Sequence, residues 1–208
     1  MLSTFLPLVP VILIFLRRIY LKESFNLLMI ICLLGFLEGF IRSSQSLNTG
    51  NQYIVHYIFS LLLFLLFIRL FIAHLKASLR YPLNIFLSAF LSSIITYGSV
   101  KGWGVHPFPV DVLLSCTLSV IILLGLPDIV QDDQLQVFRS PLFWIAGGTL
   151  FYLLLFLLLE WIGPGCLSFI PPLNPEKILF LSMAEMVRYL LYTVAVLTYR
   201  PEEGEEGG

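Results

Sequence analysis

Apolar residues dominate long stretches of this chain, and short segments rich in charge, proline or glycine separate them. A helix that crosses the hydrocarbon core of a bilayer needs about 20 mainly apolar residues. The stretches that approach this length run roughly from Leu2 to Phe15, Phe25 to Ile41, Tyr53 to Ala73, Pro82 to Ser99, Pro109 to Leu126, Pro141 to Ile162 and Glu176 to Thr198. The pattern predicts an all-α integral membrane protein, with a bundle of seven transmembrane helices over residues 1–200.

The ends of these stretches carry signals of different strength. The first stretch is short, and it reaches bilayer length only if Arg17 and Arg18 extend back to the interface. Ser140-Pro141 and Asn174-Pro175 each place a capping side chain before a proline, which favours a helix start. Tyr81-Pro82 is a weaker version of the same signal. We therefore expect helix starts at these three prolines.

Composition excludes several classes of protein. Hydrophobic residues make up 58% of the chain and charged residues 12%, whereas soluble domains are about 25% charged. The net charge of −1 gives no electrostatic reason to expect a nucleic-acid partner. Cys32, Cys116 and Cys166 lie far apart and form no ligand spacing, which argues against a metal site and a disulfide. No cofactor is expected.

Basic residues fall unevenly on the two sides of the predicted bundle. One side carries Arg17, Arg18, Lys22, Arg69, Lys76, Arg80, Arg139 and Arg200, and the other carries Arg42, Lys101 and Lys177. Because cytoplasmic loops are enriched in Lys and Arg, we expect the first side to be cytoplasmic, the N-terminus to lie outside and the C-terminus inside. Residues 201–208 are acidic and rich in glycine, which predicts a disordered cytoplasmic tail.

Two opposite charges fall in the middle of the last stretch. Glu185 and Arg188 lie at roughly 14 and 18 Å of helical rise, and their spacing of three places them on one helix face. Charges at this depth are costly and need an explanation. Two interpretations stay open: the pair holds the bundle in register, or it acts as a buried switch or a substrate-binding charge.

A second group of polar residues gathers near the outer ends of the predicted helices. Its members come from different helices: Glu38, Arg42, His56, Asp111 and Glu160. This placement predicts a ligand-binding cavity that opens outward. The alternative, that several of these residues mark the water interface, is strongest for Arg42, Asp111 and Glu160. Arg69, near the cytoplasmic end, is expected to be an anchor.

Enzyme signatures are missing from the chain, which has no G-x-S-x-G, H-E-x-x-H or phosphate-binding glycine loop. A retinal protein needs a lysine in the middle of its last helix, but Lys177 lies at the start of that stretch. Gly35 and Gly39 form a G-x-x-x-G pattern, and Ser88 with Ser92 forms a similar small-residue pair. Both patterns predict close helix packing without establishing a dimer.

Two segments resemble small bacterial seven-helix membrane modules. One runs from Asn51 through His56-Tyr57 to Lys76, and the other is the segment Ser140 to Ile145, followed by Gly148 and Tyr152. Such modules form the membrane-embedded input region of sensor histidine kinases and also occur as free-standing proteins. The resemblance implies a multi-pass protein of the bacterial inner membrane. It also implies that signalling goes through a partner, because no transmitter segment follows the last stretch.

The sequence therefore favours an inner-membrane sensor or signal-relay module with an outward-facing polar cavity and a cytoplasmic or membrane partner. The expected partner surface is formed by loops that carry Arg17, Arg18, Lys22, Lys76, Arg80 and Asp132. A small-solute or ion transporter or channel is the first alternative. A lipid-modifying enzyme is the second, and it requires His56 to lie within hydrogen-bond reach of Glu38 or Asp111.

Overall fold

The computed structural model describes residues 2–43, 49–103, 108–131, 137–162 and 175–199. These residues are helical apart from short connections, and no strand occurs among them. The elements are α1 (Leu2–Phe5), α2 (Leu8–Leu16), η1 (Ile19–Leu21), α3 (Glu23–Ser43), α4 (Thr49–Ile72), α5 (Ala77–Lys101), α6 (Phe108–Gln131), η2 (Val137–Arg139), α7 (Pro141–Ile162) and α8 (Pro175–Thr198). The six helices α3 to α8 are long and apolar enough to cross a membrane. The chain is therefore a helical membrane protein with multiple spans.

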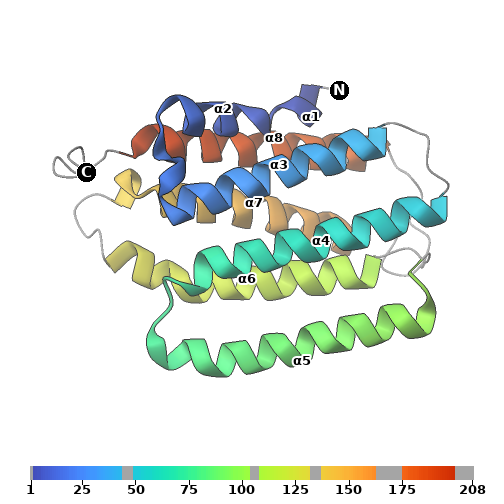
Figure 1. Ribbon diagram of the computed structural model, residues 1–208. Coiled ribbons are helices and arrows are strands. Elements are labelled where there is room, and N and C mark those ends of the chain that lie inside the picture. The colour runs from blue at the N-terminus through green and yellow to red at the C-terminus, as the bar shows by residue number, and fades with distance from the viewer. Residues whose placement is uncertain (1, 44–48, 104–107, 132–136, 163–174, 200–208) are drawn as a thin grey trace.

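The N-terminal stretch is two short helices rather than one long helix. Pro7 separates α1 from α2, because proline lacks the N–H group that a continuous helix needs and its ring crowds the preceding turn. The nine residues of α2 rise only about 14 Å, less than half of a hydrocarbon core of about 30 Å. Figure 1 shows this segment lying along α3 and α8.

The expected helix starts hold at two of the three prolines. The helices α7 and α8 begin at Pro141 and Pro175, but α5 begins at Ala77, five residues before the expected start at Pro82. Arg80 gives a physical reason, because its guanidinium donates to the carbonyls of Leu75 and Ala73 at 2.7 and 2.8 Å. These bonds satisfy carbonyls in the turn before α5 and favour a helical first turn, in spite of the proline that follows.

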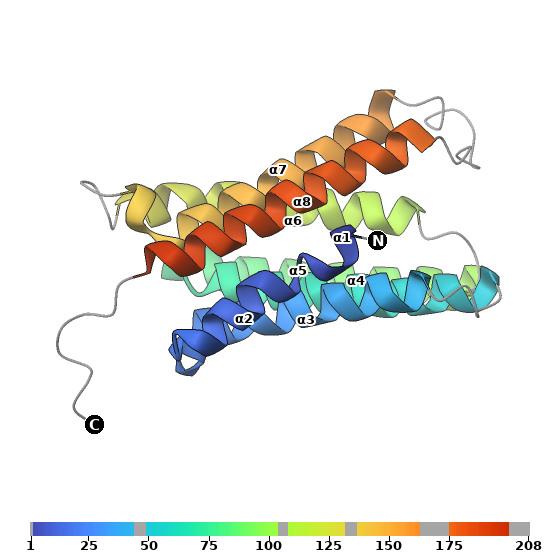
Figure 2. The same cartoon turned by 90° about the horizontal axis from the view of Figure 1, so that it is seen from above.

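Consecutive long helices run antiparallel to one another in a single bundle (Figure 1). Seen from above, α7 and α8 lie on one side, α3 and α4 lie on the other, and α6 contacts both α4 and α7 (Figure 2). The helix α5 stands at the edge and has few contacts with the others. One end of the bundle, here called the basic end, carries Arg17, Arg18, Lys22, Arg69, Lys76, Arg80 and Arg139.

The core between the helices is apolar over the half of the bundle that leads to the basic end. Its fully buried side chains include Phe71, Leu75, Ile121, Ile122 and Val196. Four polar residues are buried in the described part of the chain, namely Ser115, Ser119, Ser140 and Thr149. The hydroxyls of Ser119 and Thr149 donate to carbonyls four residues earlier at 2.8 and 2.7 Å, so neither leaves an unmet donor in the core.

Arg17 ties α2 to the end of α8. Its guanidinium donates to the carbonyl of Val196 and, at 3.2 Å, to that of Leu197. We expect Arg17→Met to lower the free energy of unfolding by about 1–3 kcal/mol, because it removes charge-assisted hydrogen bonds to helix-terminal carbonyls. Arg18→Met, at an exposed neighbouring position, is the matched control. Equal losses for both variants in a denaturant titration would contradict this role.

Candidate functional site: two polar clusters inside the bundle

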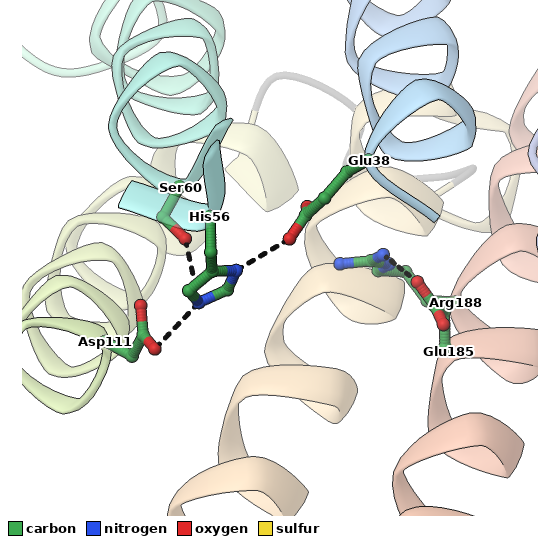
Figure 3. Close-up of polar contacts among 6 residues, drawn as sticks. All are labelled: Glu38, His56, Ser60, Asp111, Glu185 and Arg188. Carbon is green, nitrogen blue, oxygen red and sulfur yellow. Dashed lines mark hydrogen bonds and ion pairs between the residues drawn. The ribbon is translucent and has the colours of Figure 1, made fainter. Parts of the chain in front are cut away.

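A histidine joins carboxylates from two other helices near the end of the bundle opposite the basic end. His56 on α4 bonds through Nδ1 to Oε1 of Glu38 on α3 at 2.7 Å, and through Nε2 to Oδ2 of Asp111 on α6 at 2.9 Å. The Ser60 hydroxyl lies 3.4 Å from the same Nε2. Glu38, His56, Ser60 and Asp111 are called the His56 cluster below, and Figure 3 shows them converging from three helices.

The His56 cluster is shielded from solvent, and its charges are matched in part. The side chains of His56, Glu38 and Asp111 are 16%, 14% and 19% exposed. An ionised carboxylate only accepts hydrogen bonds, so both ring nitrogens donate when both carboxylates are ionised, and the ring is then an imidazolium. The three groups together then carry one net negative charge. Asp111 also lies in the first turn of α6, where the helix dipole favours a carboxylate.

Aromatic packing positions the start of α4 beside the cluster. Tyr57, the neighbour of His56, is 2% exposed and meets the Trp103 ring edge-on at a centroid distance of 5.3 Å. The indole of Trp103 covers Gly98 so closely that a Cβ there would come within 2.6 Å of it. Gly98 therefore lets the end of α5 approach Trp103 and, through it, the helix that carries His56.

A second cluster surrounds Arg188 on α8. Its Nη2 donates to Oε1 of Glu185 at 3.2 Å and to the Tyr189 hydroxyl at 3.0 Å. The guanidinium lies over the rings of Tyr152 on α7 and Tyr189, 4.2 and 4.7 Å from their centroids, which is within cation–π range. These four residues are called the Arg188 cluster below. The cluster joins α7 to α8 through the contact of Arg188 with Tyr152. It lies inside the bundle, because the Arg188 side chain is only 13% exposed.

Gly35 on α3, the helix that carries Glu38, contacts a residue of the Arg188 cluster. A Cβ at Gly35 would lie 2.4 Å from the Tyr189 hydroxyl, so the tip of the Tyr189 side chain reaches the α3 backbone only because residue 35 has no side chain. Glu38 follows three residues later on α3. The Tyr189 hydroxyl that binds Arg188 thus lies within one helical turn of the Glu38 backbone. A tyrosine side chain, not a second helix backbone, makes this contact, so the close helix packing expected from the G-x-x-x-G pattern stays a prediction.

We expect Gly35→Ala to destabilise the bundle by about 1–3 kcal/mol, because a methyl group in a filled core forces neighbouring groups apart. Gly147→Ala on α7 is the matched control, since a Cβ there meets nothing within 4 Å. Removing the opposing hydroxyl with Tyr189→Phe is expected to reduce the penalty of Gly35→Ala. Thermal unfolding in detergent is measured for the wild type, the three single variants and the double variant Gly35→Ala/Tyr189→Phe. Equal effects of the two alanine substitutions would contradict the close contact.

The structure brings together five of the seven predicted site residues in two groups. Glu38, His56 and Asp111 meet directly, and Glu185 pairs with Arg188 on α8. Arg42 and Glu160 lie near the ends of α3 and α7, and their side chains fall outside the described part of the structure. Arg69 pairs at 2.8 Å with Glu23 at the basic end, where both side chains are mostly exposed. The binding or switch roles of the seven residues stay predictions.

Sequence reasoning missed three residues that contact these groups. Ser60 lies four residues after His56, and this helical spacing could have indicated it. Tyr152 and Tyr189 gave no comparable signal, because tyrosines are numerous in this chain and only the packing of α7 on α8 selects these two. In the described residues, no group of three or more His, Cys, Asp or Glu side chains is arranged to hold a metal ion.

Comparisons of the chain with protein-family models, with curated proteins and with solved structures found no match.

Proposed function

We propose that this protein is a sensor or signal-relay module of the bacterial inner membrane, with seven membrane-embedded segments, the N-terminus outside and the C-terminus in the cytoplasm. The His56 cluster is its outward-facing ligand site, and the basic end is the surface through which it acts on a cytoplasmic or membrane partner. One observation carries the proposal: a histidine bridges two carboxylates near one end of a bundle whose other half has an apolar core. Intramembrane ionisable residues of this kind commonly mark functional sites.

The apolar half of the core favours a sensor over a transporter or channel. A solute path lined by the buried charges needs polar or water-accessible positions that continue to the basic end. The interior positions beyond the His56 cluster instead include Phe64, Phe67, Leu118, Ile121 and Ile122, each at most 5% exposed. These residues close the bundle between the cluster and the predicted cytoplasmic side.

Cysteine accessibility from the two sides tests this proposal. In a variant with the three native cysteines replaced, Ser60→Cys reports on the His56 cluster and Ser119→Cys reports on the closed half. A membrane-impermeant maleimide is added to spheroplasts and, separately, to inside-out vesicles. We expect Ser60→Cys to react from the outside only and Ser119→Cys to react from neither side. Reaction of Ser119→Cys from the cytoplasmic side would favour the transporter, and no reaction of Ser60→Cys would remove the outward-facing site.

A lipid-modifying enzyme is the second candidate, and the distances around His56 favour it. His56 lies 2.7 and 2.9 Å from two carboxylates, which is within the reach that acid–base catalysis requires. This enzyme is expected to convert a component of a total lipid extract, with conversion lost in both His56→Gln and Asp111→Asn. Mass spectra of the extract that are unchanged by the wild-type protein would remove this candidate.

A further inference from the structure

The guanidinium of Arg188 has more hydrogen-bond donors than partners. It carries five N–H groups. Its hydrogen bonds to described residues, to Oε1 of Glu185 and to the Tyr189 hydroxyl, are both made by Nη2. Within the part of the chain that the structure describes, the Arg188 Nε is buried and has no hydrogen-bond partner. A buried donor without a partner is costly, so Arg188 favours a further acceptor.

The tyrosines beside Arg188 stabilise its charge but do not supply that acceptor. The guanidinium carbon lies 4.2 and 4.7 Å from the ring centroids of Tyr152 and Tyr189. The face of an aromatic ring attracts a cation through its quadrupole, whereas the N–H groups of a guanidinium point outward in the plane of the group. The edge of the Arg188 guanidinium therefore still needs an acceptor that lies in that plane.

The bundle is closed on one side of Arg188 and open on the other. Buried side chains extend from the basic end as far as Cys32 on α3, Leu153 on α7 and Ala184 on α8. Beyond these three residues, no described side chain of the three helices is buried. Figure 2 shows α7 and α8 diverging from α3 and α4 toward this end. The diverging segments 33–41, 154–159 and 179–183 are called the open end below.

Glu185 lies at the boundary between the closed part and the open end. It shares a helix face with Tyr189 and Tyr192, four and seven residues later, which are 2% and 0% exposed. The Glu185 side chain is on the same inward face but is 36% exposed. The interior of the bundle is therefore open beside Glu185, and the ion pair of Glu185 with Arg188 forms the inner limit of the open end.

The chemistry of this region favours an acid that carries an apolar chain. A carboxylate binds the arginine fork through two parallel hydrogen bonds in one plane, and Glu185 supplies only one contact, at 3.2 Å. The residues of the open end are apolar apart from Gly35, Gly39, Glu38 and Ser182. A carboxylate with an apolar chain matches both parts, because its head binds the guanidinium and its chain covers apolar surface.

We propose that Arg188 binds the carboxylate of an acid with an apolar chain, and that the chain lies along the open end. Glu185 holds the guanidinium when the acid is absent, and the acid adds hydrogen bonds that Glu185 does not make. The site is separate from the His56 cluster, and the proposal does not rest on the sensor function.

The stability of the full chain in a non-ionic detergent, measured with octanoate as the probe, tests the proposal. Octanol is the control for the apolar chain, and acetate is the control for the carboxylate alone. A ligand that binds the folded state raises the melting temperature as its concentration rises. We expect octanoate to raise the melting temperature more than octanol or acetate does. An equal effect of octanol would overturn the carboxylate site, and an equal effect of acetate would overturn the role of the chain.

Two variants that differ only at residue 188 make the result specific. Glu185→Gln removes the carboxylate that competes for the guanidinium, so the octanoate effect is expected to be larger than in the wild type. In Glu185→Gln/Arg188→Met, the effect is expected to fall to that of octanol. Arg69→Met, which removes an exposed arginine at the basic end, is expected to keep the wild-type effect. An octanoate effect that survives in the double variant would overturn the proposal.

The double variant also keeps the test usable if Glu185→Gln alone does not fold. It has no buried charge at this position, and replacing a buried ion pair with neutral side chains is often tolerated. The comparison is then made between the wild type and the double variant. Loss of the octanoate effect in the double variant is the expected result, and equal octanoate effects in the two proteins would show that Arg188 does not bind the acid.

Discussion

His56→Phe is expected to lower the free energy of unfolding by about 3–5 kcal/mol, the typical effect of removing one partner from a buried ion pair. The phenylalanine keeps the ring volume but has neither nitrogen, so Glu38 and Asp111 lose their bonds of 2.7 and 2.9 Å to His56. These carboxylates are at most 19% exposed, and solvent cannot replace the lost donors fully. Thermal or denaturant unfolding in detergent micelles measures the difference from the wild-type protein.

An exposed ion pair at the basic end is the control for His56→Phe. Glu23 and Arg69 pair at 2.8 Å, but their side chains are 72% and 69% exposed. Glu23→Gln is therefore expected to change stability by only about 0–1 kcal/mol. Adding Asp111→Asn to His56→Phe is expected to recover part of the loss, because the amide leaves no unpaired charge. A His56→Phe protein as stable as the Glu23→Gln protein would show that the His56 cluster does not hold the three helices together.

Neutralising Glu185 and Arg188 together is expected to lower the free energy of unfolding far less than neutralising either residue alone. Glu185→Gln alone leaves the buried guanidinium without its ionic partner, and it is expected to lower the free energy of unfolding by about 1–3 kcal/mol. The double variant Glu185→Gln/Arg188→Met has no buried charge at this position. Replacing a buried ion pair with neutral side chains of similar size is often neutral or stabilising, so we expect stability near that of the wild type.

The double variant also separates a structural pair from a working one. If it keeps the stability of the wild type and loses the activity of the protein, the charges serve function. If activity survives in the double variant but is abolished in each single variant, the pair is structural and its interpretation as a buried switch is wrong. Additive losses of stability in the two single variants would show that Glu185 and Arg188 do not interact.

The helices of this fold are largely visible in the sequence, because an apolar stretch of bilayer length has few other outcomes. Six of the seven predicted stretches are long helices, and two starts fall at the expected prolines. Proline gives a less certain signal where tertiary contacts compete. Pro7 breaks a helix, whereas Pro82 and Pro127 lie inside helices.

The site could be predicted as a neighbourhood but not as a set of contacts. Alternating helix directions bring Glu38, His56 and Asp111 to the same end of the bundle, and this follows from the order of the stretches alone. Which side chains meet depends on how each helix is rotated about its own axis. A stretch with apolar residues on all faces does not specify that rotation. The contact of Gly35 with Tyr189 and the tyrosine rings around Arg188 depend on this rotation, so the sequence could not reveal them.

The most direct test of the account is to determine on which side of the membrane the His56 cluster lies. Lys101 ends α5 at the end of the bundle opposite the basic end, where the His56 cluster lies, and Lys76 precedes α5 at the basic end. Both residues are exposed. Single cysteines at these two positions are labelled with an impermeant maleimide in spheroplasts before and after permeabilisation. The account predicts that Lys101→Cys reacts with intact spheroplasts and that Lys76→Cys reacts only after permeabilisation. The reverse pattern would place the His56 cluster on the cytoplasmic side and contradict an outward-facing sensor.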